Sequence, residues 1–326
     1  MKSDVYAMVA KQPGPPTQLV EMAIEIANPG SNEVRIRHTA IGVNFIDCYY
    51  RSGLYPWPVK DNLILGSEAV GIVEAVGPDV RSAAVGDRVA YTLPNNAYST
   101  HRIIHEQHVV KVPNGISDET AAASMLKGLT ARYLLKDSYK LQAGQAVLFH
   151  AAAGGVGSIA GQWMSAMGVH AVGTAGGPAK CEMAKAHGFA DVIDYSAVDF
   201  PTSAKSLHPA GFDVVYDSVG KDTLLRSLSC LKRHGTLVNF GQSSGAVTDF
   251  EVSHLAAGSY YLTRPVLFHF TADRNWLQAA ATDLFDMIMT GSVKIHIHET
   301  APLREVARIH SDLENRRTSG SVILIP

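Results

Sequence analysis

The sequence has few cysteines and lacks long runs of one charge, and each shortage excludes a class of protein. Its 326 residues include three cysteines, Cys48, Cys181 and Cys230, too few and too scattered for a disulfide framework or a zinc ribbon. Lysine and arginine total 28 against 30 aspartates and glutamates, giving a net charge of -2. Because no long basic run occurs, no nucleic-acid partner is expected.

Long apolar segments are also missing. Without a run of 18 apolar residues, no membrane span is expected, and the N-terminal segment MKSDVYAMVAKQPGPP lacks the apolar centre of a signal peptide. Together with the scarce cysteine, this predicts a protein of a reducing compartment, the cytoplasm. The chain is 46% hydrophobic and long enough for two domains, each with its own core.

The hydrophobic pattern changes its period near residue 115. Before it, alternating runs such as EVRIRHTAIGV and DRVAYTL lie between Gly, Pro and Asn clusters and predict short strands. After it, DETAAASMLKGLTARYLL has helical spacing, and predicted strands then alternate with helices, including one over KDTLLRSLSCLKRHG. This alternation predicts βαβ units around a parallel sheet that is covered on both faces.

A third pattern follows SYYLTRPVLF. It predicts a helix over 274–290, a strand over 293–298, a helix from 303 to about 316, and a last strand, SVILI. We therefore predict an α/β fold in which a Rossmann doubly wound parallel sheet is inserted into a β-rich domain. The predicted limits are 124–267 for the Rossmann domain, and 1–123 and 268–326 for the β-rich domain.

The stretch HAAAGGVGSIAG joins a predicted strand to a predicted helix. Its core, residues 152–157, is an A-x-G-x-x-G variant of the dinucleotide-binding fingerprint. Gly154 lets the backbone approach a pyrophosphate, and Gly157 lets the helix pack closely against the strand. The helix N-terminus then offers N–H groups to the anion. We therefore predict a dinucleotide site here.

The end of the next predicted strand indicates which dinucleotide binds. An enzyme that prefers NAD usually carries an acidic residue there, which binds the ribose hydroxyls. Here the segment is VGTAGGPAKCEMA, in which the first acid is Glu182, already inside the helix. Lys180 precedes it, and a lysine attracts a 2′-phosphate that a carboxylate would repel. The predicted cofactor is NADPH.

Glu68 lies in the apolar stretch LGSEAVGIVEAVG and raises the question of a metal site. A catalytic zinc needs three protein ligands and an open position. Near Glu68 the candidates are Ser67, a weak ligand, the isolated Asp47, and Cys48, which has no second cysteine nearby. We predict no metal site. Glu68 is instead expected to be a buried structural acid with a basic or N–H partner that the sequence does not identify.

Longer stretches of the chain resemble a known family. They include AIGVNFIDCYYRSGLYP, LGSEAVGIVEAVG, AAASMLKGLTARYLL, LFHAAAGGVGSIAGQW, VVYDSVGKDT and NFGQSSGAV. The chain is similar to zinc-independent members of the medium-chain dehydrogenase/reductase superfamily, of the NADPH:quinone oxidoreductase type of bacterial quinone reductases and zeta-crystallin. The resemblance implies a GroES-like catalytic domain, a Rossmann domain, an active site between them, and a homodimer. Zinc-bearing relatives have a Cys near Asn44–Asp47 and a His where this chain has Ser67.

The resemblance also implies the residues of a cofactor site. Asn44 and Tyr49 would lie beside the nicotinamide, and Thr130 would hydrogen-bond near it. The others are expected at the pyrophosphate (Gly154, Gly155, Val156), at the 2′-phosphate (Gly173, Lys180, Tyr195, Arg316), beside the adenine (Ser218), and on the nicotinamide side (Phe240, Gly241, Ser243).

The expected reaction is hydride transfer from NADPH to a quinone. A quinone is already electron-poor, so the transfer needs proximity, orientation and a dry pocket rather than a metal. Asn44, Tyr49 and Tyr55 are the expected catalytic residues, with the tyrosines placed to stack on or hydrogen-bond to a flat acceptor. Two alternatives stay open: an NADPH-dependent reductase of activated C=C bonds in enals or enones, and a non-enzymatic NADPH-binding protein resembling a crystallin or an RNA-binding relative.

Overall fold

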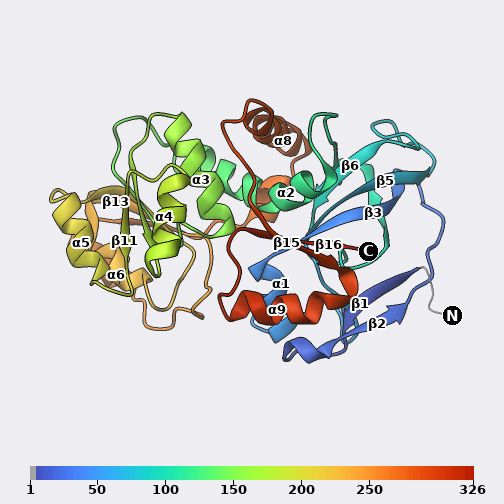
Figure 1. Ribbon diagram of the computed structural model, residues 1–326, viewed down its shortest axis with the longest axis horizontal. Coiled ribbons are helices and arrows are strands. Elements are labelled where there is room, and N and C mark those ends of the chain that lie inside the picture. The colour runs from blue at the N-terminus through green and yellow to red at the C-terminus, as the bar shows by residue number, and fades with distance from the viewer. Residues whose placement is uncertain (1–4) are drawn as a thin grey trace. The chain divides into compact units, whose positions relative to one another are not determined.

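The computed structural model describes residues 5–326 and divides the chain into two compact units. Unit 1 comprises the chain up to Leu126 together with Phe268–Met289 and Ile295–Pro326. Unit 2 comprises Lys127–Leu267 and Thr290–Lys294. The middle of the chain, coloured from green through yellow to orange in Figure 1, therefore folds as a unit of its own within the sequence of the other.

Unit 2 contains a six-stranded sheet of order β11-β10-β9-β12-β13-β14. All neighbouring strands are parallel. The order is that of a doubly wound dinucleotide-binding sheet, in which the strand order reverses beside the first strand, here β9. The predicted fold class is thus confirmed. The strands are β9 (Val147–Phe149), β10 (Ala171–Ala175), β11 (Asp191–Asp194), β12 (Phe212–Asp217), β13 (Leu231–Asn239) and β14 (Tyr261–Thr263).

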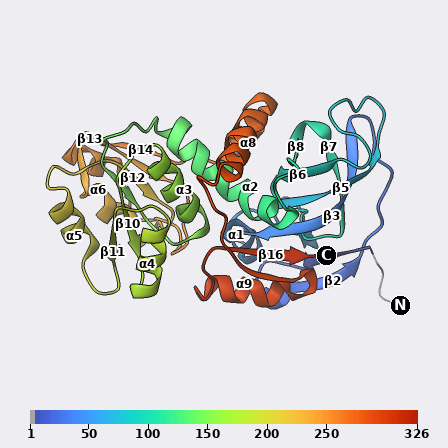
Figure 2. The ribbon, with the colours of Figure 1, turned by 45° about the horizontal axis from the view of Figure 1, so that its top comes forward.

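Helices cover both faces of this sheet. Figure 2 shows α3 (Gly155–Ala166) and α4 (Pro178–Ala186) on one side, and α5 (Phe200–Leu207) and α6 (Leu224–Leu228) on the other. One core cluster joins Leu148, Val172 and Val215 of the strands to apolar side chains of α5 and α6. Burial on both faces is the reason why these strands are continuous apolar runs in the sequence.

Unit 1 contains a seven-stranded sheet of order β15-β16-β3-β5-β6-β8, with β7 also paired to β3, and a three-stranded sheet of order β2-β1-β4. The C-terminal strand β16 pairs with β3, Val322 opposite Val43, so the end of the chain completes a sheet begun near its start. The strands are β1 (Tyr6–Ala10), β2 (Leu19–Ala23), β3 (Glu33–Val43), β4 (Leu63–Ile64), β5 (Glu68–Val76), β6 (Arg88–Thr92), β7 (His101–His105), β8 (Val109–Lys111), β15 (Ile297–Pro302) and β16 (Ser321–Ile325).

Two of the α-helices outside the Rossmann sheet were predicted accurately. These are α2 (Asp118–Tyr133), which a π-helical turn over Leu134–Ser138 prolongs, and α8 (Arg274–Met289). The others are α1 (Phe45–Ser52), α7 (Leu267–Thr271) and α9 (Val306–Glu314). Within residues 5–326, no helix combines the length and the apolar character needed to cross a bilayer.

Three predicted boundaries were wrong. The helix predicted over 221–235 ends at Leu228, because Leu231 already pairs with Phe212 in the sheet. The strand predicted from residue 293 begins at Ile297. Before it, the main chain of Lys294 exchanges two hydrogen bonds, of 2.8 and 3.0 Å, with the side chain of Gln162 on α3. The helix predicted to reach about residue 316 ends at Glu314.

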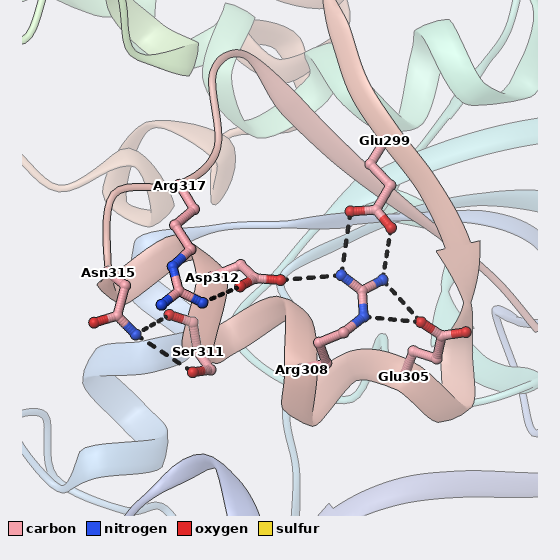
Figure 3. A network of polar contacts seen from close by, with 7 residues as sticks. All are labelled: Glu299, Glu305, Arg308, Ser311, Asp312, Asn315 and Arg317. Atoms are coloured by element: carbon pink, nitrogen blue, oxygen red, sulfur yellow. Dashed lines mark hydrogen bonds and ion pairs between the residues drawn. The ribbon is translucent and has the colours of Figure 1, made fainter.

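An ion-pair network at the surface fixes α9 to β15 (Figure 3). Arg308 on the helix contacts Glu299 of the strand at 2.6 Å, Glu305 at 2.8 Å and Asp312 at 3.0 Å. Arg317 contacts the second oxygen of Asp312 at 3.4 Å. Isolated surface pairs contribute little, but a network with one bidentate arginine at its centre constrains the geometry of the helix end.

Candidate functional site

The carboxylate of Glu68 is fully buried and bound by two N–H donors. Its Oε1 accepts a hydrogen bond from Asn44 Nδ2 at 2.8 Å, and its Oε2 accepts one from the backbone N–H of Leu126 at 2.6 Å. Gly42 on the adjacent strand leaves the room that this carboxylate needs, because a Cβ atom there would collide with Glu68 Oε1 and Ala122 O. Glu68 is therefore the buried structural acid that was predicted, and it fixes the side chain of Asn44.

A second buried carboxylate, Asp47, lies in the first turn of α1. Its Oδ1 accepts a hydrogen bond from Ser67 Oγ at 2.6 Å, and its Oδ2 accepts one from Tyr98 OH at 2.8 Å and one from Asn44 N at 2.9 Å. Burial raises the pKa of Asp47 to about 6, although these three donors oppose the rise. The Tyr98 hydroxyl lies 2.9 Å from His310 Nε2, which links α1 to α9 through buried groups.

These residues do not fit a zinc ion. The Ser67 hydroxyl donates a hydrogen bond to Asp47 Oδ1, so these two oxygen atoms bind each other rather than a metal ion. Cys48 Sγ lies 3.5 Å from His310 Nδ1, and burial raises the pKa of its thiol, which disfavours the thiolate that zinc requires. Across residues 5–326, no three His, Cys, Asp or Glu side chains are grouped so that they could hold a metal.

The structure brings the predicted residues Tyr49 and Tyr55 together. Their ring centroids lie 5.3 Å apart, and Tyr50 meets Tyr55 edge-on at 5.5 Å. Gly53, with φ of 83°, ends α1 in the left-handed conformation and turns the chain, so that Tyr55 N donates to Tyr49 O at 3.1 Å. Both rings are half-buried. The result is an aromatic cluster on and just after α1, the helix that begins directly after Asn44.

The phosphate loop has the geometry that its sequence predicted. Gly154 is the N-cap of α3 and, having no side chain, leaves the first N–H groups of that helix for a ligand. A Cβ atom on Gly157 would lie 2.5 Å from Ala151 O and 2.7 Å from Ala152 O, so only glycine permits this packing. Gly155 and Val156 follow as the first residues of the helix. The loop therefore fits the pyrophosphate of a dinucleotide.

The loops after β12 and β13 meet at the same edge of the sheet. A Cβ atom on Gly241 would lie 2.7 Å from Ser218 O, and Ser243 N donates to that same oxygen at 3.1 Å. Phe240 N donates to Asp217 O at 2.8 Å. Ser218, Phe240, Gly241 and Ser243 are thus brought together. The carboxyl edge of such a sheet, next to the reversal of strand order, is where dinucleotides bind.

The sequence reasoning missed Asp217, which organises this edge. Its fully buried carboxylate accepts hydrogen bonds from Val219 N at 2.7 Å, Gly220 N at 3.0 Å and Thr223 Oγ1 at 2.8 Å. These bonds fix the loop that carries Ser218. The available signal was an acid at the end of an apolar strand, FDVVYD, which is costly to bury unless such donors surround it.

On the predicted adenosine side, Gly173 has a packing role. A Cβ atom there would lie 2.7 Å from Ala152 Cβ, so glycine is required for β10 to pack against the phosphate loop. Tyr195, 45% exposed, places its hydroxyl 2.7 Å from where a Cβ atom of Gly176 would be. Lys180 lies in the first turn of α4, which follows this glycine segment. Lys180 and Tyr195 thus follow the carboxyl ends of β10 and β11, whereas Gly173 lies in the middle of β10.

Thr130 and Arg316 complete the predicted set. Thr130 is buried on α2 in unit 2. Arg316 lies in unit 1, two residues beyond the end of α9, with φ of 58°, so it does not belong to the last helix as predicted. A residue in the left-handed conformation cannot continue a helix. Asn44, Tyr49 and Tyr55 also belong to unit 1.

Comparison with known proteins agrees with this description. Residues 30–141 match the alcohol dehydrogenase GroES-like domain, and residues 155–280 match the zinc-binding dehydrogenase family. A quinone oxidoreductase of Pseudomonas aeruginosa is 48% identical over 316 residues, which cover 96% of this chain and 97% of that protein. A 2-haloacrylate reductase of a Burkholderia species is 39% identical over 331 residues, which cover 99% of each protein.

A solved structure extends the likeness to three dimensions. The crystal structure of Escherichia coli quinone oxidoreductase complexed with NADPH superimposes with a TM-score of 0.95 at 41% identity, covering 98% of this chain and 100% of that one. Fold, domain models and sequence identity therefore agree over nearly the whole length of the chain. The protein is an oxidoreductase that belongs to the medium-chain dehydrogenase/reductase superfamily and, within it, to the quinone oxidoreductase family.

Proposed function

We propose that the protein is an NADPH-dependent quinone oxidoreductase that needs no metal. The E. coli relative, with a TM-score of 0.95, is complexed with NADPH, and the phosphate loop of this chain has the glycines and free helix N-terminus for the same group. Lys180 lies in the first turn of α4, where an NAD enzyme would have an acidic residue nearby. The arrangement favours the 2′-phosphate of NADPH over the ribose hydroxyls of NADH.

The observation that carries the acceptor class is the hydrogen bond between Asp47 and Ser67. By the family resemblance, Ser67 stands where zinc-bearing relatives have a His, and Asp47 lies in the segment where they have a Cys. The two side chains bind each other at 2.6 Å. An acceptor reduced here must therefore be electron-poor already, as quinones are. When bound, NADPH supplies the hydride. Glu68 fixes Asn44 beside the nicotinamide, and the cluster of Tyr49 and Tyr55 offers flat apolar faces to the quinone ring.

A specific observation supports a second candidate function. The 39% identical Burkholderia relative is a 2-haloacrylate reductase, so reduction of an activated C=C bond is compatible with this scaffold. We would follow NADPH absorbance in steady state with benzoquinones, 2-alkenals and 2-haloacrylate. We expect the largest kcat/KM with benzoquinones. A clear preference for the alkenes would replace the quinone assignment, and a lack of turnover with all three would leave a non-enzymatic NADPH-binding protein.

The cofactor assignment has its own test. Lys180→Ala removes a charge-assisted contact, so Kd for NADPH should rise by roughly 10- to 100-fold. NADH lacks the 2′-phosphate, so its Kd should stay unchanged. Lys185→Ala is the matched control, since Lys185 lies on the same helix and pairs with Glu182 at 2.9 Å. Equal effects of Lys180→Ala on both cofactors would show that this lysine does not recognise the 2′-phosphate.

We also propose that the enzyme is a cytoplasmic homodimer, as the family resemblance implies. Strand β14 is the last strand of the Rossmann sheet, and its Tyr261 is 62% exposed, which suits pairing with a second copy. Light scattering after gel filtration should give 69.8 kDa, twice the 34.9 kDa of one chain. A mass of one chain would contradict the dimer.

A further inference from the structure

Lys127 is a buried lysine on α2 that lies against the phosphate loop. It is only 6% exposed, which is rare for a lysine. Its stem covers Gly155, since a Cβ atom built there would lie 2.7 Å from Lys127 Cδ and 2.9 Å from its Cε. Gly155 is the first residue of α3. The ammonium group, one bond beyond Cε, therefore lies near the N-terminus of the helix of the phosphate loop.

This arrangement places two positive features side by side. The N-terminus of α3 carries the positive end of the helix dipole, and the first turn contains the neutral residues Gly155, Val156, Gly157 and Ser158. Lys127 adds a full positive charge at this point. An anion bound to the N–H groups of the loop would be attracted by both features.

The position of Thr130 on α2 supports a place for Lys127 beside the bound cofactor. It lies three residues after Lys127 on α2, and residues i and i+3 share one face of a helix. Both side chains are 6% exposed. The family resemblance implies that Thr130 hydrogen-bonds near the nicotinamide. Lys127, one turn earlier on that face and in contact with Gly155, would then lie near the phosphates that connect the nicotinamide half to the adenosine half.

We propose that Lys127 binds the pyrophosphate of the dinucleotide, in a role separate from that of Lys180. The inference rests on the proposed NADPH-dependent function. The pyrophosphate is common to NADPH and NADH, whereas the 2′-phosphate occurs only in NADPH. Lys127 therefore sets the affinity for both cofactors, and Lys180 sets the choice between them.

The test uses Lys127→Met, which keeps an apolar stem over Gly155 and removes the charge. Kd would be measured by titration for NADPH, NADH and ADP-ribose, which all contain the pyrophosphate, and for 2′-AMP, which does not. We expect the first three to weaken by a common factor of roughly 10- to 100-fold, and 2′-AMP binding to stay unchanged. Lys140→Met, at an exposed lysine of the same unit, is the control and should change none of them.

Other outcomes would overturn the inference. These are unchanged Kd values in Lys127→Met, a loss confined to NADPH, or a fall in kcat alone, which would place the ammonium at the acceptor. Lys127→Arg keeps the charge and should retain most of the affinity. If the Arg and Met variants lose affinity equally and also melt earlier, the effect is one of packing, and the assignment fails. A wild-type protein that binds none of the four ligands would instead refute the proposed function itself.

Discussion

Replacing Glu68 tests whether this buried carboxylate orients Asn44. Its two oxygens serve different donors, Asn44 Nδ2 at 2.8 Å and Leu126 N at 2.6 Å. Glu68→Ala removes both acceptors. Glu68→Gln keeps one carbonyl oxygen for Leu126 and turns an NH2 group toward Asn44. The Asn44 amide can then rotate by half a turn and present its own oxygen to that NH2 group.

The two substitutions should therefore separate stability from activity. Glu68→Ala leaves two buried donors without this acceptor at roughly 1–3 kcal/mol each, so we expect a loss of about 4 kcal/mol. In a unit of this size, that loss corresponds to a fall in Tm of roughly 12 °C. Glu68→Gln should cost only about 1 kcal/mol. Because it reverses the amide that we propose to lie beside the nicotinamide, its kcat with benzoquinone should fall by about tenfold or more.

Thermal unfolding followed by circular dichroism, together with steady-state rates at saturating NADPH, would measure both effects. Glu74→Gln is the matched control, because Glu74 lies on the same strand, β5, and forms a surface pair with Arg37 at 3.1 Å. It should alter Tm and kcat little. If Glu68→Gln lowers Tm as much as Glu68→Ala does, the Asn44 amide does not rotate and the reasoning is wrong. An unchanged Tm for Glu68→Ala would show that neither donor depends on Glu68.

The other predictions concern pH, the phosphate loop and zinc. Burial lowers the pKa of His38 and of His310 to about 3 in the folded protein, from about 6.5 in the unfolded chain. Their contribution to stability is therefore complete above about pH 6.5 and is lost as the pH falls. Asp47, with its pKa raised to about 6, acts in the opposite sense, its contribution being lost as the pH rises through that value. In urea titrations, His310→Gln should therefore lower the slope of unfolding free energy against pH, between pH 4 and 6, by about 1 kcal/mol per pH unit, and an unchanged slope would contradict this. Gly157→Ala would bring a Cβ atom to 2.5 Å from Ala151 O, so it should destabilise the protein by about 1–3 kcal/mol and weaken NADPH binding in titrations; wild-type affinity would show that the loop can adapt. Elemental analysis of purified protein should find no stoichiometric zinc, and one zinc per chain would refute our interpretation of Asp47 and Ser67.

Much of the fold could be predicted because its signals are local. The segment DETAAASMLKGLTARYLL predicted the helix that the structure has at Asp118–Tyr133, and SVILI predicted the strand at Ser321–Ile325. Errors arose where distant partners decided the local structure. Leu231 joins a strand because Phe212 lies beside it, and residue 294 is kept out of the strand at Ile297–Pro302 by the side chain of Gln162. Neither partner lies within a helical turn of the segment that it changes.

The candidate site also contains residues that the sequence could predict and residues that only the structure revealed. The glycine loop could be predicted because its function depends on consecutive residues, whose backbone must approach an anion. Asp217 and Lys127 could not be selected in this way, since an acid at a strand end and a lysine on a helix are common. Their importance follows from the donors around Asp217 and from the glycine beneath Lys127.

By itself, the sequence determined the alternation of strands and helices, the phosphate loop, and the lack of an acidic residue over 172–181, the segment that precedes Glu182. Only the tertiary structure decided which groups surround the buried acids. It pairs Asp47 with Ser67, 20 residues away, and Glu68 with Asn44 and Leu126, 24 and 58 residues away. The physical reason is that periodicity and glycine conformation act over a few neighbouring residues. Sheet register and helix packing, in contrast, bring distant donors together, and a buried carboxylate is stable only where such donors meet it.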